Sequence, residues 1–278
     1  MILESNTEAR AMALWPEYVK SNNVPMQWSG NVDTGNPGQL SAAAINGIMG
    51  KINWARKMAF LEPVLNDATL NDDCQEVCLY LTANPKWVIS HSLARVEGVR
   101  WWTQKAAAAA MKSCIDRMDE GPRSIMDMIR DFDLARVNEL VGHRRWLLNW
   151  KQTHVGVGSI PQSHKYAASC CIYVNTPPKS PRESVDVAWP PAGAVPMVCV
   201  PERWSFSPAN ADVSRAIVRF DGVAVPSARQ NSSTLAPVVV WQPKLPFNIE
   251  DTHLVEIDNI IVGGQEKSLR YTVSRFRP

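Results

Sequence analysis

Proline is distributed unevenly along this chain, and the distribution limits where helices can form. Of the 20 prolines, 13 lie from Thr176 onward. Proline lacks a backbone N–H and disfavours a helical conformation in the residue before it, so a proline-rich segment favours short strands and turns. The densest cluster, at residues 175–184, is typical of a linker. We therefore expect the architecture to change near residue 178.

The length of 278 residues predicts two domains, because one hydrophobic core rarely extends over so long a chain. We assign residues 1–34 to an N-terminal extension, 35–177 to a first domain that contains helices, and 178–278 to a second domain built from strands.

The first domain is expected to mix helices with a few strands. Ser41 is a capping residue, and isoleucines follow it at helical spacing. The predicted helices cover residues 41–57, 71–83 (with Asn71 as cap), 104–118 and 124–132, and the predicted strands cover 145–150, 154–158 and 170–174. This alternation indicates an α+β domain in layers.

The second domain shows short runs with strand periodicity at residues 216–220, 238–241, 253–257 and 269–273. Alternation is clear in the last run, where Leu269, Tyr271 and Val273 share one face. Asp221-Gly222 and the glycines at 263 and 264 are strong turn signals. A small antiparallel β-sandwich is the expected fold.

The overall composition excludes several functional classes. A net charge of +2 without a long Lys/Arg run argues against nucleic acid as a partner. No apolar run approaches the roughly 20 residues that span a bilayer, and the first ten residues do not resemble a signal peptide. The six cysteines form no CxxC pair, which argues against a zinc ribbon. Free thiols are the simplest interpretation, and any disulfides would join cysteines that are distant in the sequence.

His91 and His143 are the first candidate site residues, although two histidines 52 positions apart are more often structural than functional. Their surroundings change that balance, because several short motifs appear in a fixed order. These are Ile-Asn-Trp-Ala-Arg at 52–56, Leu-Asn-Asp-Ala-Thr-Leu at 65–70, Ser-His at 90–91, Val-Gly-His-Arg-Arg-Trp at 141–146 and His-Val-Gly-Val-Gly at 154–158.

In this order the motifs, over about residues 35–175, resemble the CAP superfamily, also called SCP-like or cysteine-rich secretory, antigen 5 and pathogenesis-related. The resemblance implies an α-β-α sandwich and secretion from the cell. Clusters of Trp, Pro and Gly at 30–38, 187–193 and 203–207 resemble a bacterial subgroup that appends a β domain.

The resemblance also implies a cleft lined by two histidines and two acidic residues, which could bind a divalent cation such as Zn²⁺ or Ca²⁺. His91 and His143 match the histidines, and Asp131 falls where the second acid is expected. The first acid has no counterpart, since residues 110–114 supply lysine and serine instead. We place Arg145 beside these residues in the expected ligand cleft.

Other residues have competing interpretations. Arg144 and Arg145 could bind an anionic ligand, although structural pairing is commoner. Trp101-Trp102 could expose one ring for a ligand, whereas most of the eleven tryptophans should be core. Cys114 could be a nucleophile, although a buried helical cysteine is more common.

The sequence therefore favours a non-enzymatic protein that binds a small apolar, glycan or protein ligand in the histidine-lined cleft. The alternative is a metal-assisted hydrolase that uses His91, His143 and Asp131. A third hypothesis is an interaction protein with an inert cleft. Local motifs of serine hydrolases, zincins and P-loop enzymes are absent from the sequence.

Overall fold

A computed structural model describes residues 1–86, 91–131, 138–232, 234–245 and 250–278. Its α-helices are α1 (Glu8–Asn22), α2 (Ala42–Met58), α3 (Ala68–Ala83), α4 (Gln104–Ala110), α5 (Gly121–Arg130) and α6 (Gly142–Leu147), and a 3₁₀ helix covers Met197–Cys199.

The strands form three sheets. They are β1 (Leu65–Asn66), β2 (Ser113–Asp116), β3 (His154–Ile160), β4 (Ser169–Tyr173), β5 (Val187–Trp189), β6 (Gly193–Pro196), β7 (Trp204–Ser207), β8 (Ile217–Phe220), β9 (Val223–Val225), β10 (Ser227–Gln230), β11 (Val238–Trp241), β12 (Asp251–Val262) and β13 (Gln265–Phe276).

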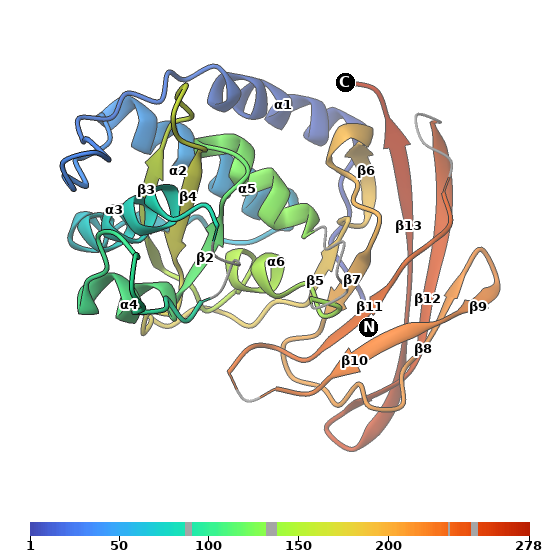
Figure 1. Cartoon of the computed structure of the whole chain (residues 1–278). Helices are drawn as coiled ribbons and strands as arrows, with labels where there is room; N and C mark the ends of the chain where they lie inside the picture. Colours follow the sequence, from blue (N-terminus) through green and yellow to red (C-terminus); the bar gives the residue numbers. More distant parts are fainter. Residues whose placement is uncertain (87–90, 132–137, 233, 246–249) are drawn as a thin grey trace.

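The first sheet, in the order β1-β3-β4-β2, lies between two helical layers (Figure 1). Cys170 and Ile172 of β4 belong to the core that contains α2 and α5, whereas Cys171 and Tyr173 belong to a second core that contains α3 and α4. Successive strand residues point to opposite faces, so both faces of this sheet are covered. The predicted α-β-α sandwich is confirmed.

Two glycines of β3 allow α3 to approach the sheet closely. A Cβ atom at Gly156 would lie 2.4 Å from the Cβ of Leu70, and one at Gly158 would lie 2.6 Å from the carbonyl carbon of Cys74. Glycine in a strand interior often marks such an approach. The glycines that alternate with valines at 154–158 therefore allow α3 to pack closely against β3. This strand forms where it was predicted.

Four predicted elements differ from the structure. The helix expected over 124–132 begins earlier, at Gly121, and ends at Arg130. The helix expected to begin at Asn71 begins at Ala68, because Asp67 caps it and Asn71 instead accepts a hydrogen bond from Val157 N (2.8 Å). The helix expected over 104–118 ends at Ala110, since residues from Ser113 onward pair with β4. The strand expected over 145–150 is wrong, because residues 142–147 form α6.

The strands after residue 187 form two sheets, in the orders β10-β11-β7-β5 and β6-β13-β12-β8-β9. The hairpin turns predicted at Asp221-Gly222 and at the paired glycines occur, with positive φ at all four residues. One pairing departs from the antiparallel expectation, because β6 runs parallel to β13. This region is β-rich as predicted.

The N-terminal residues connect the two regions. Asn6 exchanges backbone hydrogen bonds with Ala192 and Ala194 (both 2.8 Å), and its side chain donates to Met58 O at the end of α2 (2.9 Å). The following helix, α1, was not predicted, and it lies along the top of Figure 1, reaching toward β6. One continuous core runs from α2 and α5 to the buried Trp189, so the two regions pack directly together.

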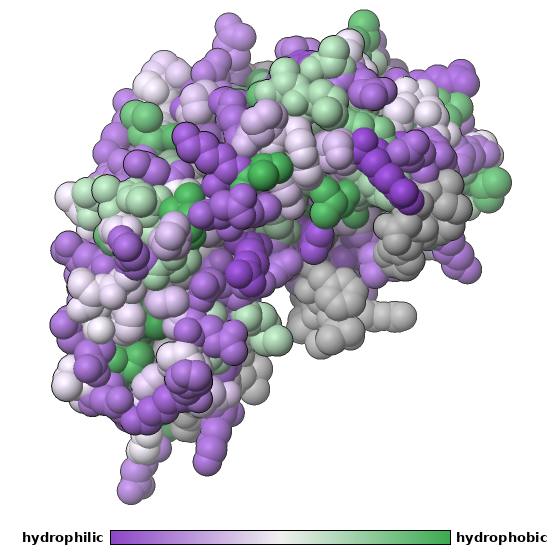
Figure 2. Space-filling model, turned by 90° about the horizontal axis from the view of Figure 1, so that it is seen from above, coloured by the Kyte–Doolittle hydropathy of each residue, from purple (hydrophilic) through white to green (hydrophobic). Residues whose placement is uncertain are grey.

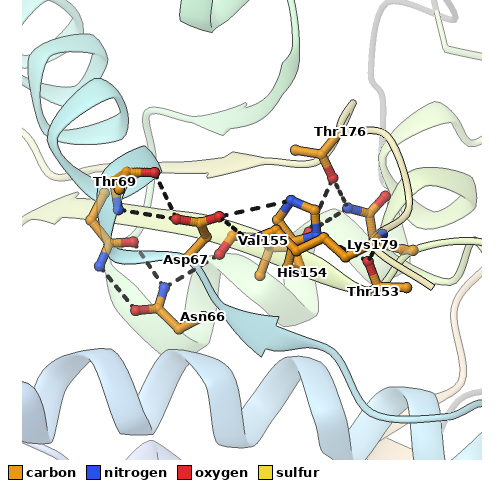
Figure 3. A network of polar contacts seen from close by, with 10 residues as sticks. Asn66, Asp67, Thr69, Thr153, His154, Val155, Thr176 and Lys179 are labelled. Atoms are coloured by element: carbon orange, nitrogen blue, oxygen red, sulfur yellow. Dashed lines mark hydrogen bonds and ion pairs between the residues drawn. The ribbon is translucent and has the colours of Figure 1, made fainter.

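The segment predicted to be a linker lies against the first region (Figure 3). Lys179 Nζ is 2.7 Å from Asp67 Oδ2, and Arg182 donates to two backbone carbonyls at residues 62 and 63. His154 lies in the same network, 3.8 Å from Asp67. These contacts attach residues 179–182 to the edge of the sheet.

Among the residues that the structure describes, no helix combines the length and apolar character needed to cross a membrane. Figure 2 shows a face that is mostly hydrophilic, with apolar side chains in small, separate groups. All six cysteines are buried and free, as expected.

Candidate functional site

His91 and His143 lie side by side although 51 residues separate them in the chain. Their ring centroids are 5.9 Å apart and the rings are inclined by 54°. His143 is the second residue of α6, and His91 precedes the half-buried chain that leads to α4. The Ser90 that accompanies His91 in the sequence motif lies outside the described residues.

Asp131 fixes one side of His143. It follows α5 in a left-handed conformation (φ 53°), is 3% exposed, and its Oδ1 lies 3.0 Å from His143 Nδ1. The same carboxylate accepts hydrogen bonds from Asn138 Nδ2 (2.5 Å) and from the backbone N–H of Arg144 (3.4 Å). These hydrogen bonds hold the Asp131 carboxylate in place behind the imidazole of His143.

Asn138 and Arg203 complete this corner. Asn138 Oδ1 accepts from Gly142 N (2.8 Å), which satisfies a free N–H at the start of α6. The guanidinium of Arg203 donates to the backbone carbonyls of Asp131 and Asn138. Val141, before α6, has φ 46°, a strained conformation for a β-branched residue, and such strain persists only where neighbours impose it.

His91 has a different acceptor. Its Nδ1 lies 3.1 Å from the carbonyl oxygen of Ala110, at the end of α4. Desolvation of the ring lowers the pKa of His91; the Ala110 carbonyl acts in the opposite direction, and the nearby His143 lowers it further. His91 is therefore predominantly neutral near pH 7.

The hydrogen-bond partners define the tautomer of each neutral ring. A carbonyl or carboxylate oxygen can only accept, so Nδ1 carries the proton in both histidines. Nε2 of each neutral imidazole is then an acceptor. An unprotonated imidazole nitrogen is a chemical type that accepts hydrogen bonds or coordinates cations.

Arg144 and Arg145 extend away from α6 in two directions. Arg144 is buried and donates to the carbonyls of Ile129 (2.5 Å) and Arg130 (2.8 Å) and to Ser205 Oγ (3.0 Å). Burial lowers the pKa of Arg144 to about 9, while Asp131 opposes that shift.

Arg145 donates to Gln230 Oε1 (3.0 Å) and Ala236 O (2.9 Å), and burial lowers its pKa to about 10. Arg145 was expected in the histidine cleft, with residues 145–150 predicted to form an extended strand. Because α6 is a helix, the hydrogen bonds of Arg145 go to β10 and to the loop before β11 instead.

Comparison with known families now adds to the geometry. Residues 49–173 match the family model of the cysteine-rich secretory protein family, CAP. The chain contains a CAP domain. The match includes both histidines, Asp131 and the elements from the second part of α2 to β4.

No curated protein matches the chain. Among solved structures, similarity is found to CopC from Methylosinus trichosporium OB3b, with 13% identity and a TM-score of 0.26 over 34% of this chain and 95% of that one. PcoC, a methionine-rich copper resistance protein from Escherichia coli, gives 18% identity and a TM-score of 0.24 over 32% and 93%.

The donor set of the CAP domain does not fit a protein-bound metal well. Structural zinc sites use four protein ligands and catalytic ones use three. Here the described residues bring together two imidazoles, while Asp131 is directed at His143 Nδ1 and His91 Nδ1 faces the backbone carbonyl of Ala110. No described group of three or more His, Cys, Asp or Glu side chains could hold a metal.

Sequence reasoning missed the groups that support the histidines. The carbonyl of Ala110 has no signature, because any residue supplies one. Asn138 lies outside the quoted motifs. Arg203 begins the cluster at 203–207, which was quoted only for its resemblance to an appended β domain, and only the fold brings Arg203 to the end of α5. A polar residue four positions before Gly142 was the one local signal, as a potential cap of α6.

Trp101, Trp102 and Cys114 do not contribute an open reactive group. Both tryptophans are half-buried, and their indole N–H groups donate to Val32 O (2.8 Å) and Leu93 O (3.1 Å). Neither tryptophan is in the fully exposed class. Cys114 is buried on β2, where desolvation raises its pKa well above the usual value.

Proposed function

We propose that the CAP domain binds a ligand at the pair formed by His91 and His143, and that it does not catalyse a reaction. The ligand is a small apolar molecule, a glycan or a protein segment that presents a hydroxyl or N–H group to the imidazoles. The observation that carries the proposal is the arrangement of the two rings, each with Nδ1 held by an internal oxygen.

The environment of Asp131 supports binding over hydrolysis. A general base must reach the proton that it removes, directly or through one water. Asp131 is 3% exposed and accepts hydrogen bonds from His143, Asn138 and Arg144. It acts as a positioning residue that orients His143, and the Ala110 carbonyl does the same for His91.

The alternative is a metal-assisted hydrolase that uses His91, His143 and Asp131. The hydrogen bond from His143 to Asp131 favours it, because a carboxylate behind an imidazole raises the basicity of the other ring nitrogen. This function requires a third ligand from solvent or substrate.

A calorimetric titration with Zn²⁺, combined with hydrolysis of a p-nitrophenyl ester, separates the two functions. The variants are His91→Ala and His143→Ala, and His164→Ala is the control, because His164 is an exposed histidine. Ligand binding would be followed on a glycan array and with a fluorescent fatty acid.

We expect the two site variants to lose binding of a captured ligand, while the control retains it. Zinc affinity in the micromolar range together with ester hydrolysis, both lost in His91→Ala and His143→Ala, would favour the hydrolase instead.

We also propose that the protein is bacterial and acts outside the cytoplasm, as the family resemblance implies. Fractionation of cells that express the native gene tests this localisation. Recovery of the protein in the cytoplasmic fraction alone would contradict it.

A further inference from the structure

A small cavity, partly open to solvent, lies between α6 and strands β5 and β7. Its volume is about 20 Å³, enough for one occupant the size of a water molecule. The wall includes Arg145 and Trp150 on one side and Val187, Trp189 and Ser207 on the other.

Three residues of this wall carry buried donors without a partner in the described part of the chain. They are Arg145 Nε, Trp150 Nε1 and Trp189 Nε1. Arg145 is 9% exposed and Trp189 is fully buried. Leaving a buried donor unpaired is costly, so three such donors in the wall of one cavity indicate an occupant that accepts hydrogen bonds.

The charge of the residues around the cavity supports the same conclusion and indicates that the occupant is negatively charged. No ion pair joins Arg145 to a carboxylate among the described residues, and its two hydrogen-bond acceptors are the neutral Gln230 side chain and the Ala236 carbonyl. The second arginine of the wall, Arg144, has Asp131 as its nearby negative charge. Buried charges are ordinarily paired, so the cavity lacks one negative charge.

We propose that this cavity binds a single small monovalent anion, chloride under physiological conditions. Its donors would be the guanidinium of Arg145 and the indole N–H groups of Trp150 and Trp189, which lie on the positive edges of the rings. A cavity of this volume has room for one monatomic ion. A water molecule would satisfy the donors but leave the positive charge unpaired. The site lies two residues from His143 but is independent of the proposed ligand function.

The test is thermal unfolding of the full chain in sodium chloride, sodium bromide and sodium gluconate at constant ionic strength. Binding to the folded state alone raises the midpoint with anion concentration. We expect chloride and bromide to raise it by roughly 2–4 °C over gluconate. Crystals soaked in bromide should show a bromine anomalous peak in the cavity.

Two indole variants form a matched pair. Trp189→Phe removes one donor from the cavity, whereas Trp241→Phe removes an equally buried and unpartnered indole N–H that does not line it. Both variants lower stability in gluconate. We expect the chloride-dependent increment to shrink in Trp189→Phe and to persist in Trp241→Phe.

If Trp189→Phe does not fold, Trp150→Phe provides the same comparison at a half-buried position. The proposal is overturned if chloride and gluconate give the same midpoint, if bromide produces no anomalous peak in the cavity, or if the cavity variants retain the full increment.

Discussion

The two halves of the candidate site are supported by different parts of the molecule. His143 lies in a corner that is bonded to the C-terminal region, through Arg144 to Ser205 and through Arg203 to Asp131. The core around α3 and α4, next to His91, contains no described residue beyond Tyr173. The C-terminal sheets therefore hold one histidine in place, whereas the CAP layers alone hold the other.

This difference gives the C-terminal region a role within the CAP site. A rigid element that positions a functional side chain is usually supported by a second set of contacts behind it. Here that set includes β7 and the residues before it, some 60 positions after His143. The predictions below test this asymmetry, from the largest expected effect to the smallest.

A chain that ends at residue 177 should lose its cooperative fold. Truncation exposes the face of α2 and α5 that packs against Trp189 and its neighbours in the shared core, and it removes Ser205 and Arg203 from the His143 corner. Circular dichroism and urea unfolding of the truncated chain measure this.

The division into domains at 177 and 178, which was inferred from the proline distribution, is tested by the same experiment. A truncated chain that unfolds cooperatively, with His91 and His143 giving their full-length NMR signals, would show that the CAP layers need no support from the C-terminal sheets.

Replacing Asp131 should cost far more stability than replacing His91. Asp131→Ala leaves Arg144 buried without its negative neighbour and removes the acceptor of His143, and breaking such a buried arrangement costs about 3–5 kcal/mol. His91 is exposed, so His91→Ala should change stability by less than about 1 kcal/mol. Urea unfolding compares the two.

Asp131→Asn is the matched control, because the amide oxygen can still accept a hydrogen bond from His143. It should lose less stability than Asp131→Ala. Equal losses for Asp131→Ala and His91→Ala would contradict the asymmetry between the two halves.

The hydrogen bond from Arg144 to Ser205 Oγ links the two regions directly. Ser205→Ala removes the acceptor of a charged, buried donor, and hydrogen bonds to charged groups contribute about 1.5–3 kcal/mol. Ser207→Ala, two residues along the same strand and half-buried, is the control and should change stability by less. Similar losses in both variants would indicate that the contact is not specific.

The sequence predicted the site better than its supports. The short motifs that contain histidine, aspartate and glycine occur in a fixed order along the chain. His91, His143 and the strand over 154–158 could therefore be located from these motifs. The helix α6 could not, because its six residues are fixed by Asn138 and by contacts of Arg144 that arise only in the folded chain.

The supports of His91 were unpredictable for a different reason. The carbonyl of Ala110 reaches the ring only because the alanine-rich helix stops at that residue and the chain turns into β2. Alanine favours continuation of a helix. Pairing of residues 113–116 with β4 overrides this local preference, and no pattern within the segment indicates it.

The smallest predicted effect concerns the titration of the two imidazoles. His91 has a pKa below its ordinary value of 6.5, first because its ring is desolvated and further because His143 is close. In His143→Gln the second cause disappears, so the pKa of His91 should rise, as measured by NMR titration of its ring protons.

The sign for stability follows from proton uptake. Because the pKa of His91 is lower in the folded state, the unfolded chain binds more protons as pH falls below about 6.5, and folding is weakened in that range. The effect is small because the His91 ring is only partly desolvated. Removing His143 should reduce this acid sensitivity, whereas His164→Ala should leave the titration of His91 unchanged. An unchanged His91 pKa in His143→Gln would mean that the two halves of the site do not interact electrostatically.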